Sequence, residues 1–474
     1  MALLLIVAAL PEVSAQNDSL KAQNDLLKEQ NDLLKAQNDL LKAQNDLLKA
    51  QKDSLKAQKD SLKANELTIG LEFLTHGEVC RGGLPKQKDE AKVVDDKANF
   101  LLGRTRLAVG YQHKGLEARA VIQNTAICGM KNNMDLALYE GWVKMTLKNG
   151  LFAQVGRMVL SYDDERIIGP DDWAMASMSH DVLRLGYEGH GHRVHGILAY
   201  NQNKDNTKSG TFYDDGAQPY KTMQTLWYHY ELPKYPLGAS LLFMNIGLQA
   251  GTEQENPHTE YQQLLGAYIK WSPKIMTVEG SYYRQFGRNE YCAKVDAWMA
   301  SLKATVTPSR YYSIEAGYDH LSGDDYMAVP QPGMIGLPRH EVFKGFAPLY
   351  GSHHDFYGVM DYFYKSAYLN GFTPGLQNAF VGGYFNPTSK LTIHAAYHYM
   401  AVATKLQGLD KTLGHDIELE ASYQFTKDIS LSLGYTYMIG TETMNRLKQG
   451  AEDKHVRWGW FSLSISPRLF TFKW

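Results

Sequence analysis

The stretch Ile417-Glu418-Leu419-Glu420-Ala421-Ser422-Tyr423-Gln424-Phe425 alternates apolar and polar side chains with a period of two. After Thr426-Lys427-Asp428, the alternation resumes over residues 429–437. A period of two places successive side chains on opposite faces of a β-strand. The two stretches therefore predict an antiparallel hairpin that has a tight turn, one apolar face and one polar face.

The same pattern recurs toward the N-terminus as far as residue 66. We expect strands near residues 66–76, 97–111, 115–126, 134–147, 151–160, 181–188, 193–200, 220–231, 237–249, 259–271, 275–286, 295–306, 311–320, 371–385, 391–401, 415–425, 429–440 and 456–474. Every second connection is short and rich in turn-forming residues, whereas the others are mostly longer, up to the segment 321–370. Short turns on one rim and long loops on the other are typical of an outer-membrane barrel, and a soluble β-sandwich has no reason to alternate them. We therefore predict an all-β fold, a transmembrane antiparallel β-barrel of about 18 strands over residues 66–474.

The composition argues against two other classes of protein. Beyond residue 10, no apolar run is long enough to cross a bilayer as a helix. The formal net charge of −2 gives no case for a nucleic-acid partner. Cys80, Cys128 and Cys292 are odd in number and share no close spacing, so they indicate neither a disulfide framework nor a zinc site. Free thiols and one Cys80–Cys128 bridge between outer loops are the two alternatives.

The N-terminus is read first as a targeting signal. An apolar core over residues 3–10 precedes the small residues Val13-Ser14-Ala15, so residues 1–15 resemble a secretory signal peptide. No Lys or Arg precedes the apolar core, which departs from the usual signal.

Residues 16–64 repeat a seven-residue unit, best seen in Gln23-Asn24-Asp25-Leu26-Leu27-Lys28-Glu29. A strict period of seven predicts a supercoiled α-helix, here an α-helical coiled-coil stalk in the periplasm. One such helix cannot bury its apolar stripe alone, so we expect self-association. Dimers, trimers and higher oligomers all fit the pattern, and fusion of the helix to a barrel favours a homotrimer. A simple spacer is the alternative. Peptidoglycan is a further candidate partner of the stalk. The expected oligomerisation residues are Leu20, Leu27, Leu34, Leu41, Leu48, Leu55 and Leu62.

The chain ends in the alternating aromatic stretch Phe470-Thr471-Phe472-Lys473-Trp474. This ending resembles the signal by which the barrel-assembly machinery recognises bacterial outer-membrane proteins. That machinery and outer-membrane lipid are therefore expected partners.

Within the predicted barrel, several stretches carry a family resemblance. They are Arg104-Thr105-Arg106, Tyr139-Glu140-Gly141-Trp142-Val143, residues 156–157 and 161–169, Asp172-Trp173, Ser179-His180-Asp181, and residues 321–325, 346–351 and 356–361. They resemble the alginate export porin family and its Bacteroidetes-type relatives, which form single-chain barrels of eighteen strands. The resemblance implies a channel for an anionic polysaccharide or a smaller solute, with a loop that enters or roofs the pore. The residues expected in this constriction loop are Asp163, Asp164, Arg166 and Trp173.

A porin acts through the size of its pore and the charges that line it, so candidates must lie on the polar strand faces. The expected pore-lining residues are Arg104, Arg106, Arg119, Glu140, Lys144, Arg157, Arg184, Glu279, Glu418 and Glu420. One interpretation of the early basic cluster is an arginine ladder that attracts carboxylate or phosphate groups. The other is that lumen Arg and Glu side chains pair and brace the barrel wall.

Three further constellations have the residue types of a reactive site. His190, His192 and His195 fall at a predicted short turn in mixed directions, which disfavours metal ligation. Acidic residues in two outer loops offer oxygen ligands for calcium. The alternative is that these carboxylates are simply solvated loop residues. These residues are Asp163, Asp164, Glu165, Asp324 and Asp325. The adjacent Ser179-His180-Asp181 cannot meet as nucleophile, base and orienting group, so we expect no catalytic residues and no enzyme activity.

Together these patterns predict an outer-membrane porin, a trimeric passive channel for small polar or anionic solutes or saccharides, without a cofactor. An envelope-tethering protein whose stalk spans the periplasm toward the cell wall is the first alternative. A polysaccharide exporter is the second.

Overall fold

The computed structural model describes residues 65–82, 97–130, 134–214, 216, 218–324, 342–363, 373–448 and 455–474, and residues 27, 28, 34, 35 and 42 of the repeat. The chain divides into two compact units, Met1–Asn65 with Trp474, and Glu66–Lys473. In the first unit, the five described positions of the repeat are helical, and Leu27 and Leu34 are exposed. The predicted signal peptide and Leu20, Leu41, Leu48, Leu55 and Leu62 lie outside the described residues. The coiled coil and its trimer therefore stay predictions.

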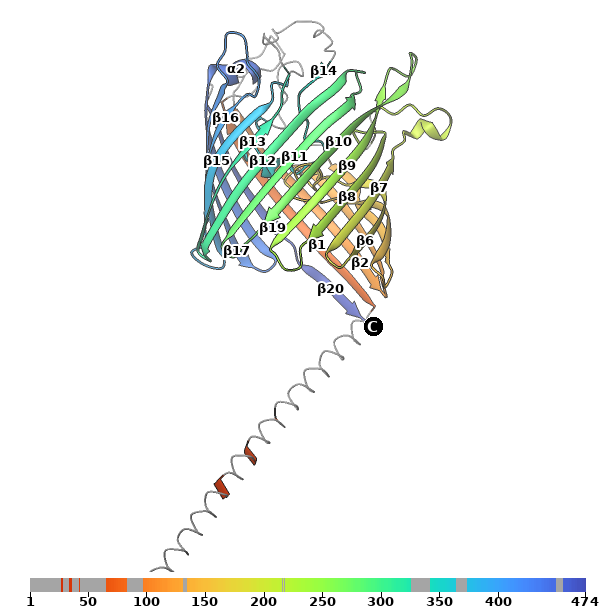
Figure 1. Ribbon diagram of the computed structural model, residues 1–474, viewed down its shortest axis with the longest axis vertical. Coiled ribbons are helices and arrows are strands. Elements are labelled where there is room, and N and C mark those ends of the chain that lie inside the picture. The colour runs from red at the N-terminus through yellow and green to blue at the C-terminus, as the bar shows by residue number, and fades with distance from the viewer. Residues whose placement is uncertain are drawn as a thin grey trace, which may run out of the picture. The chain divides into compact units, whose positions relative to one another are not determined.

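The second unit is a β-barrel (Figure 1). Its long strands are β1 (Glu66–Arg81), β2 (Lys97–His113), β3 (Leu116–Ile127), β4 (Met134–Thr146), β5 (Leu151–Met158), β6 (His180–Gly189), β7 (His192–Tyr200), β8 (Thr222–Glu231), β9 (Leu237–Ala250), β10 (His258–Trp271), β11 (Met276–Arg288), β12 (Lys294–Ser309), β13 (Tyr312–Leu321), β15 (Leu376–Phe385), β16 (Leu391–Ala401), β17 (Thr412–Thr426), β18 (Ile429–Gly440), β19 (Val456–Ile465) and β20 (Arg468–Lys473).

From β1 to β19, each long strand pairs antiparallel with the next long strand in chain order, and β1 pairs both with β2 and with β19 and β20. This last pairing closes the sheet, so each of the described long strands from β1 to β19 has a partner strand on both sides. Because β19 and β20 follow one another along β1, they count as one strand of the ring. The barrel is therefore eighteen-stranded and antiparallel, as the sequence predicts.

Several details differ from the sequence prediction. β1 continues to Arg81, beyond the predicted end near residue 76. β15 begins at Leu376, not at residue 371. The last predicted strand is divided at Ser466 and Pro467, because proline has no N–H to donate to the ladder. The short strand β14 (Val342–Phe343), which pairs parallel with β12, was not predicted.

The two faces of the wall have opposite character. In β17, Leu419 is 54% exposed, whereas the neighbouring Glu418 is 2% exposed. The same inversion recurs around the barrel, where leucines such as Leu302 and Leu433 are exposed on the outside. Apolar residues outside and polar residues inside are the arrangement of a transmembrane barrel and the reverse of a soluble one.

The two rims also differ as expected. The helix α2 (Glu442–Lys448) and β14 lie at the end of the barrel opposite to β20 (Figure 1). The longer connections at this long-loop rim include the 3₁₀ helices η1 (Lys204–Thr207) and η2 (His353–Asp355). Within the described part of the chain, no helix combines the length and apolar character needed to cross a membrane. All three cysteines are free thiols, so the alternative of a Cys80–Cys128 bridge is wrong.

Candidate functional site: the lumen and its inward loops

The segment 159–179, which connects β5 to β6, lies inside the barrel. Its residues Leu160 and Ile168 are buried, and Ile168 forms a β-bridge with Tyr350 of the connection between β13 and β15. Trp227 on β8 donates from Nε1 to Asp163 Oδ1 at 3.0 Å. Since this segment also reaches inner-face residues of β2, β13 and β19, it crosses the lumen. Two loops that meet in this way narrow the interior of the barrel.

Arg166 joins segment 159–179 to strand β13 of the barrel wall. Its guanidinium pairs with Asp319 on β13 at 3.1 Å and with Asp164 at 3.2 Å, and it donates to the Tyr357 hydroxyl at 3.0 Å. It also lies 4.0 Å from the centroid of the Phe356 ring. Arg166 is 5% and Asp319 is 2% exposed, so this ion pair is screened little by water. The predicted constriction residue Arg166 is therefore a buried anchor.

Arg104 and Arg106 on β2 hold the same segment from the other side. Arg104 pairs with Glu72 of β1 at 2.7 Å, and Arg106 pairs with Asp172 at 3.0 Å. Both also donate to the Ser177 hydroxyl, at 3.0 and 2.7 Å. Burial alone would raise the pKa of the Asp172 carboxyl, but Arg104 and Arg106 hold that pKa below its usual value. The two arginines are thus satisfied by groups of the protein.

The other predicted basic residues also have partners in the wall. Arg119 pairs with Glu140 at 2.8 Å, and Arg157 pairs with Asp181 at 2.5 Å. Arg184 donates to Gln154 and, at 3.4 Å, to the Tyr162 hydroxyl. The Lys144 ammonium lies 4.7 Å from the centroid of the Phe152 ring. These contacts favour bracing of the wall over a free arginine ladder.

Trp173 packs into a cluster of rings on the inner wall. Its ring stacks on His354 with centroids 3.8 Å apart and an interplanar angle of 1°. It meets His76 of β1 edge-on at 4.3 Å and Trp460 of β19 at 4.9 Å. His354 in turn pairs with Asp361 at 3.2 Å. This cluster joins both inward loops to the seam where β1 meets β19.

The opposite wall gathers carboxylates and histidines. His394 on β16 lies between Glu315 of β13 and Glu420 of β17, at 3.4 and 3.3 Å. His398, four residues further along β16 on the same face, lies 3.5 Å from Glu418. Glu418 also accepts a hydrogen bond at 2.8 Å from the Val359 backbone N–H of the inward loop.

Glu279 on β11 completes this wall through a separate set of contacts. It pairs with Lys270 at 3.1 Å and with Lys303 at 3.6 Å, and it accepts from the Tyr268 hydroxyl at 2.6 Å. The predicted Glu279, Glu418 and Glu420 therefore belong to one side of the lumen.

A cavity of about 600 Å³ lies between this wall and the inward loops. Its charged and histidine lining residues are Asp163, Asp164, Glu165, Arg166, Lys270, Glu279, Lys303, Glu315, Asp319, His354, Asp355, His394, His398, Glu418 and Glu420. Nine of them are carboxylates and three are Arg or Lys. The cavity is polar, and its nine carboxylates outnumber the Arg, Lys and His side chains together, so it carries an excess of negative charge.

A second cavity of about 360 Å³ adjoins the first. The two share Asp163, Tyr268 and Lys270 as lining residues. The second also reaches Pro236 and Ser272, which belong to the short turns after β8 and β10. The two cavities therefore follow one another toward the short-turn rim.

The three histidines noted in the sequence bond to different partners. His190, His192 and His195 bond separately to Tyr187, Tyr228 and Tyr162.

In the sequence Ser179-His180-Asp181, His180 bonds to the Tyr220 hydroxyl at 2.8 Å and Asp181 pairs with Arg157, so no triad forms.

The acidic loop residues suggested for calcium have protein partners. Asp163 accepts from Trp227, Asp164 pairs with Arg166, and Glu165 accepts from the Ser161 and Ser352 hydroxyls. Asp325 lies outside the described residues. Calcium at these carboxylates stays an untested expectation.

Several residues of the cavity were not predicted from the sequence. His394 and His398 share the polar face of the strand 391–401, so the alternation carried the signal to find them. Asp319 stands on the same face as Glu315 in the strand predicted at residues 311–320. The sequence does not show which strands line the cavity, because this depends on the path of the inward loops. These residues could therefore not be assigned to the cavity from the sequence.

No protein-family model and no curated protein matches this chain. Among solved structures, it is similar to OccK5 (OpdH) of Pseudomonas aeruginosa, with a TM-score of 0.56 and 11% identity over 85% of this chain and 99% of that chain. OccK2 (OpdF) of the same organism gives a TM-score of 0.56 at 12% identity, over 85% and 98% of the two chains. OccAB1 of Acinetobacter baumannii gives 0.55 at 13%, over 85% and 97%.

These structures are outer-membrane porins, and at such low identity the likeness concerns the fold. The chain therefore has a porin-like β-barrel. None of the three is described as an alginate exporter, so that finer resemblance stays a prediction.

Proposed function

We propose that this protein is an outer-membrane porin, a passive channel for small polar solutes. The observation that carries the proposal is the polar cavity of about 600 Å³ inside a closed barrel whose outer face is apolar. The second cavity extends this space toward the short-turn rim. Transport of this kind depends on the shape and charge of the passage and needs no catalytic residue.

The volume of the cavity favours small solutes over a polymer. Sites for small molecules commonly measure about 300–1,000 Å³, and the cavity between the loops and the wall falls within this range. The inward segments are fastened at several points, by Arg166 on one side and by Arg104 and Arg106 on the other. A polysaccharide exporter would have to move these buried anchors, so we place it behind the channel for small solutes.

The charge of the cavity favours cationic or zwitterionic solutes over anions. Nine carboxylates and three Arg or Lys line it, and partial exclusion of water strengthens their field. The anion preference expected from the arginine cluster is not part of our proposal, because Arg104, Arg106, Arg119 and Arg157 all pair with carboxylates.

The test is the conductance of the purified full-length protein in planar bilayers, with the reversal potential measured under a salt gradient. We expect discrete channel steps and a reversal potential shifted toward that of the cation. A reversal potential shifted toward the anion would support the arginine ladder instead. Absence of conductance from correctly folded protein would contradict the porin proposal and favour the envelope-tethering alternative.

We also propose that the heptad-repeat segment forms a periplasmic stalk that associates as a trimer. The repeat of leucine every seven residues supports it, as do the helical positions at Leu27 and Leu34. Three conductance levels that open and close together, and a trimer mass in detergent by sedimentation, are the expected results. A monomer by sedimentation would contradict this part of the proposal.

A further inference from the structure

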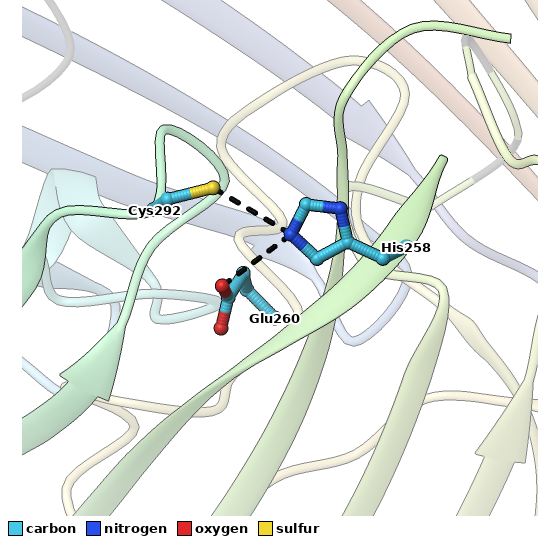
Figure 2. A group of neighbouring side chains, drawn as sticks. All are labelled: His258, Glu260 and Cys292. Carbon is cyan, nitrogen blue, oxygen red and sulfur yellow. Dashed lines mark hydrogen bonds and ion pairs between the residues drawn. The ribbon is translucent and has the colours of Figure 1, made fainter. Parts of the chain in front are cut away.

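His258, Glu260 and Cys292 come together at the long-loop rim of the barrel (Figure 2). His258 is the first residue of β10, and Glu260 lies two positions further along the same strand, so their side chains share one face. Cys292 lies in the connection between β11 and β12, more than thirty positions away in the sequence. In the described part of the chain, no other group of three His, Cys, Asp or Glu side chains comes as close together.

The face that carries these side chains is the inner one. Further along β10, Leu264 is fully buried whereas Leu265 is 52% exposed on the outer face. His258 and Glu260 are an even number of residues from Leu264 and therefore point to the inside of the barrel. The side chains of His258 and Glu260 are 35% and 21% exposed. The group is thus accessible from the aqueous mouth of the barrel.

The distances match those between the ligands of a tetrahedral metal ion. His258 Nε2 lies 3.6 Å from Cys292 Sγ and 3.4 Å from Glu260 Oε1, and all three ligand atoms lie within 4.8 Å of one another. Zinc binds sulfur at about 2.3 Å and nitrogen or oxygen at about 2.0–2.2 Å, so tetrahedral angles give a nitrogen–sulfur separation of about 3.6 Å and a nitrogen–oxygen separation of about 3.4 Å.

The imidazole is held in the tautomer that a metal requires. His258 Nδ1 lies 2.8 Å from the Asn256 carbonyl oxygen, which can only accept, so Nδ1 carries the proton. In the neutral imidazole, Nε2 then has the lone pair, and Nε2 faces Glu260 and Cys292. A backbone carbonyl on the second ring nitrogen is the usual partner of a metal-binding histidine.

Two connections position the histidine and the thiol. At Gly251, with φ +75°, a Cβ would lie 2.2 Å from the Asn256 carbonyl oxygen, so glycine allows that carbonyl to reach His258. Cys292 adopts φ 63°, and its backbone N–H donates to the Asn289 carbonyl at 2.9 Å. Arg288 donates to the Cys292 carbonyl at 2.6 Å. The turn therefore presents the thiol to β10.

We propose that His258, Glu260 and Cys292 bind one divalent transition-metal ion of the zinc type at the mouth of the barrel. The combination of imidazole, thiolate and carboxylate suits zinc and disfavours calcium or magnesium, which prefer oxygen ligands. Three protein ligands leave a fourth position for water or for a solute group. The ion also joins the start of β10 to the connection between β11 and β12, and so stabilises this part of the rim.

The first experiment measures zinc bound to the full-length protein in detergent, after removal of metal with a chelator and dialysis against zinc. We expect one zinc per chain in the wild type and in Cys128→Ser, which removes an exposed thiol elsewhere. Cys292→Ser and His258→Gln should weaken binding by more than about 100-fold, because substitution of a residue that only hydrogen-bonds to a metal ligand already costs about 10–100-fold. Equal zinc affinity in the wild type and Cys292→Ser would overturn the proposal.

Two measurements on the wild type avoid variants that fail to fold. Cobalt(II) in place of zinc should give the thiolate-to-metal charge-transfer absorption of a sulfur ligand. Zinc should also slow alkylation of Cys292 at least about tenfold while leaving the exposed Cys128 of the same molecule unaffected, as read by peptide mass spectrometry. Equal protection of both thiols, or of neither, would contradict a site at Cys292. Channel conductance of Cys292→Ser separates this result from the proposed function, since we expect a channel with or without the metal.

Discussion

The two sides of the lumen carry charge in different ways. The arginine wall, formed by Arg104, Arg106, Arg119, Arg157 and Arg184 on β2, β3, β5 and β6, directs its charges into contacts with the protein. The acid–histidine wall lines the open cavity from β11, β13, β16 and β17. Its residues are Glu279, Glu315, Asp319, His394, His398, Glu418 and Glu420.

The charges of the arginine wall stabilise the inward segments, whereas those of the acid–histidine wall determine the electrostatic potential of the cavity. A guanidinium such as that of Arg106, satisfied by Asp172, Ser177 and Gln123, has little attraction left for a passing anion. The carboxylates of the opposite wall outnumber the Arg and Lys around them. Anchoring and selectivity should therefore respond to different substitutions.

The largest loss of stability should come from removing Arg166, which joins segment 159–179 to β13. Arg166→Met leaves Asp319 buried with its main cationic partner lost, and breaking a buried pair by removing one member costs about 3–5 kcal/mol. We expect the free energy of unfolding to fall by about that amount, measured by urea titration of the protein folded into lipid vesicles. We also expect larger and noisier channel steps, because segment 159–179 loses its attachment to β13.

The matched control is Arg119→Gln. Arg119 pairs with Glu140 but is 45% exposed, and exposed pairs contribute only about 0–1 kcal/mol. Equal losses from Arg166→Met and Arg119→Gln would contradict the distinction between a buried anchor and a solvated wall pair.

A smaller effect should follow from weakening the arginine wall itself. The double substitution Arg104→Gln with Arg106→Gln removes charged hydrogen bonds to Glu72, Asp172 and Ser177. Such bonds contribute about 1.5–3 kcal/mol, and because Asp172 is half exposed we expect a loss of about 2 kcal/mol in all. The reversal potential should stay on the cation side, although the channel becomes noisier. A large change in the cation-to-anion preference would show that these arginines act on solutes. The control is Lys144→Gln, because Lys144 has no carboxylate partner among the described residues.

Substitutions in the acid–histidine wall should change ion selectivity by a still smaller free energy. Glu315→Gln and Glu420→Gln each remove one negative charge from the lining of the cavity. Both carboxylates contact His394. A unit charge about 8 Å from a permeating ion in a water-like medium contributes about 0.5 kcal/mol, or about twofold in the permeability ratio. We expect the cation-to-anion ratio to fall by about twofold for each substitution with little loss of stability. An unchanged ratio in the double variant would contradict the selectivity proposed for this wall.

The fold could be predicted from the sequence because each strand carries its own signal. The alternation over residues 417–425 places Leu419 outside and Glu418 inside, and the structure agrees. The interruption at Pro467 follows from a known property of proline, although the sequence prediction passed over it.

The site depends on contacts that local pattern does not encode. Arg104 and Arg106 share a face in any strand, but their role follows from Asp172, which lies more than sixty positions away. Likewise, His258 and Cys292 meet only because β10 and β11 are paired. Residue type and period therefore identified the polar lumen, whereas the pairing of its charges required the structure.

The smallest effect concerns pH and follows from the Asp172 carboxyl. Arg104 and Arg106 hold its pKa below the usual value, so the attachment it provides is fully present above the ordinary aspartate pKa of about 3.9 and is lost as the pH falls through the lower, folded value. We therefore expect no loosening of segment 159–179 between about pH 7 and pH 5, and added channel noise only below about pH 4. Bilayer recordings over this range provide the measurement, and Asp172→Asn, which removes the charge at every pH, should show at neutral pH the noise that the wild type reaches only in acid. Noise that rises in the wild type at pH 5–6 would mean that a group with a higher pKa, such as a histidine of the opposite wall, controls the inward loops instead.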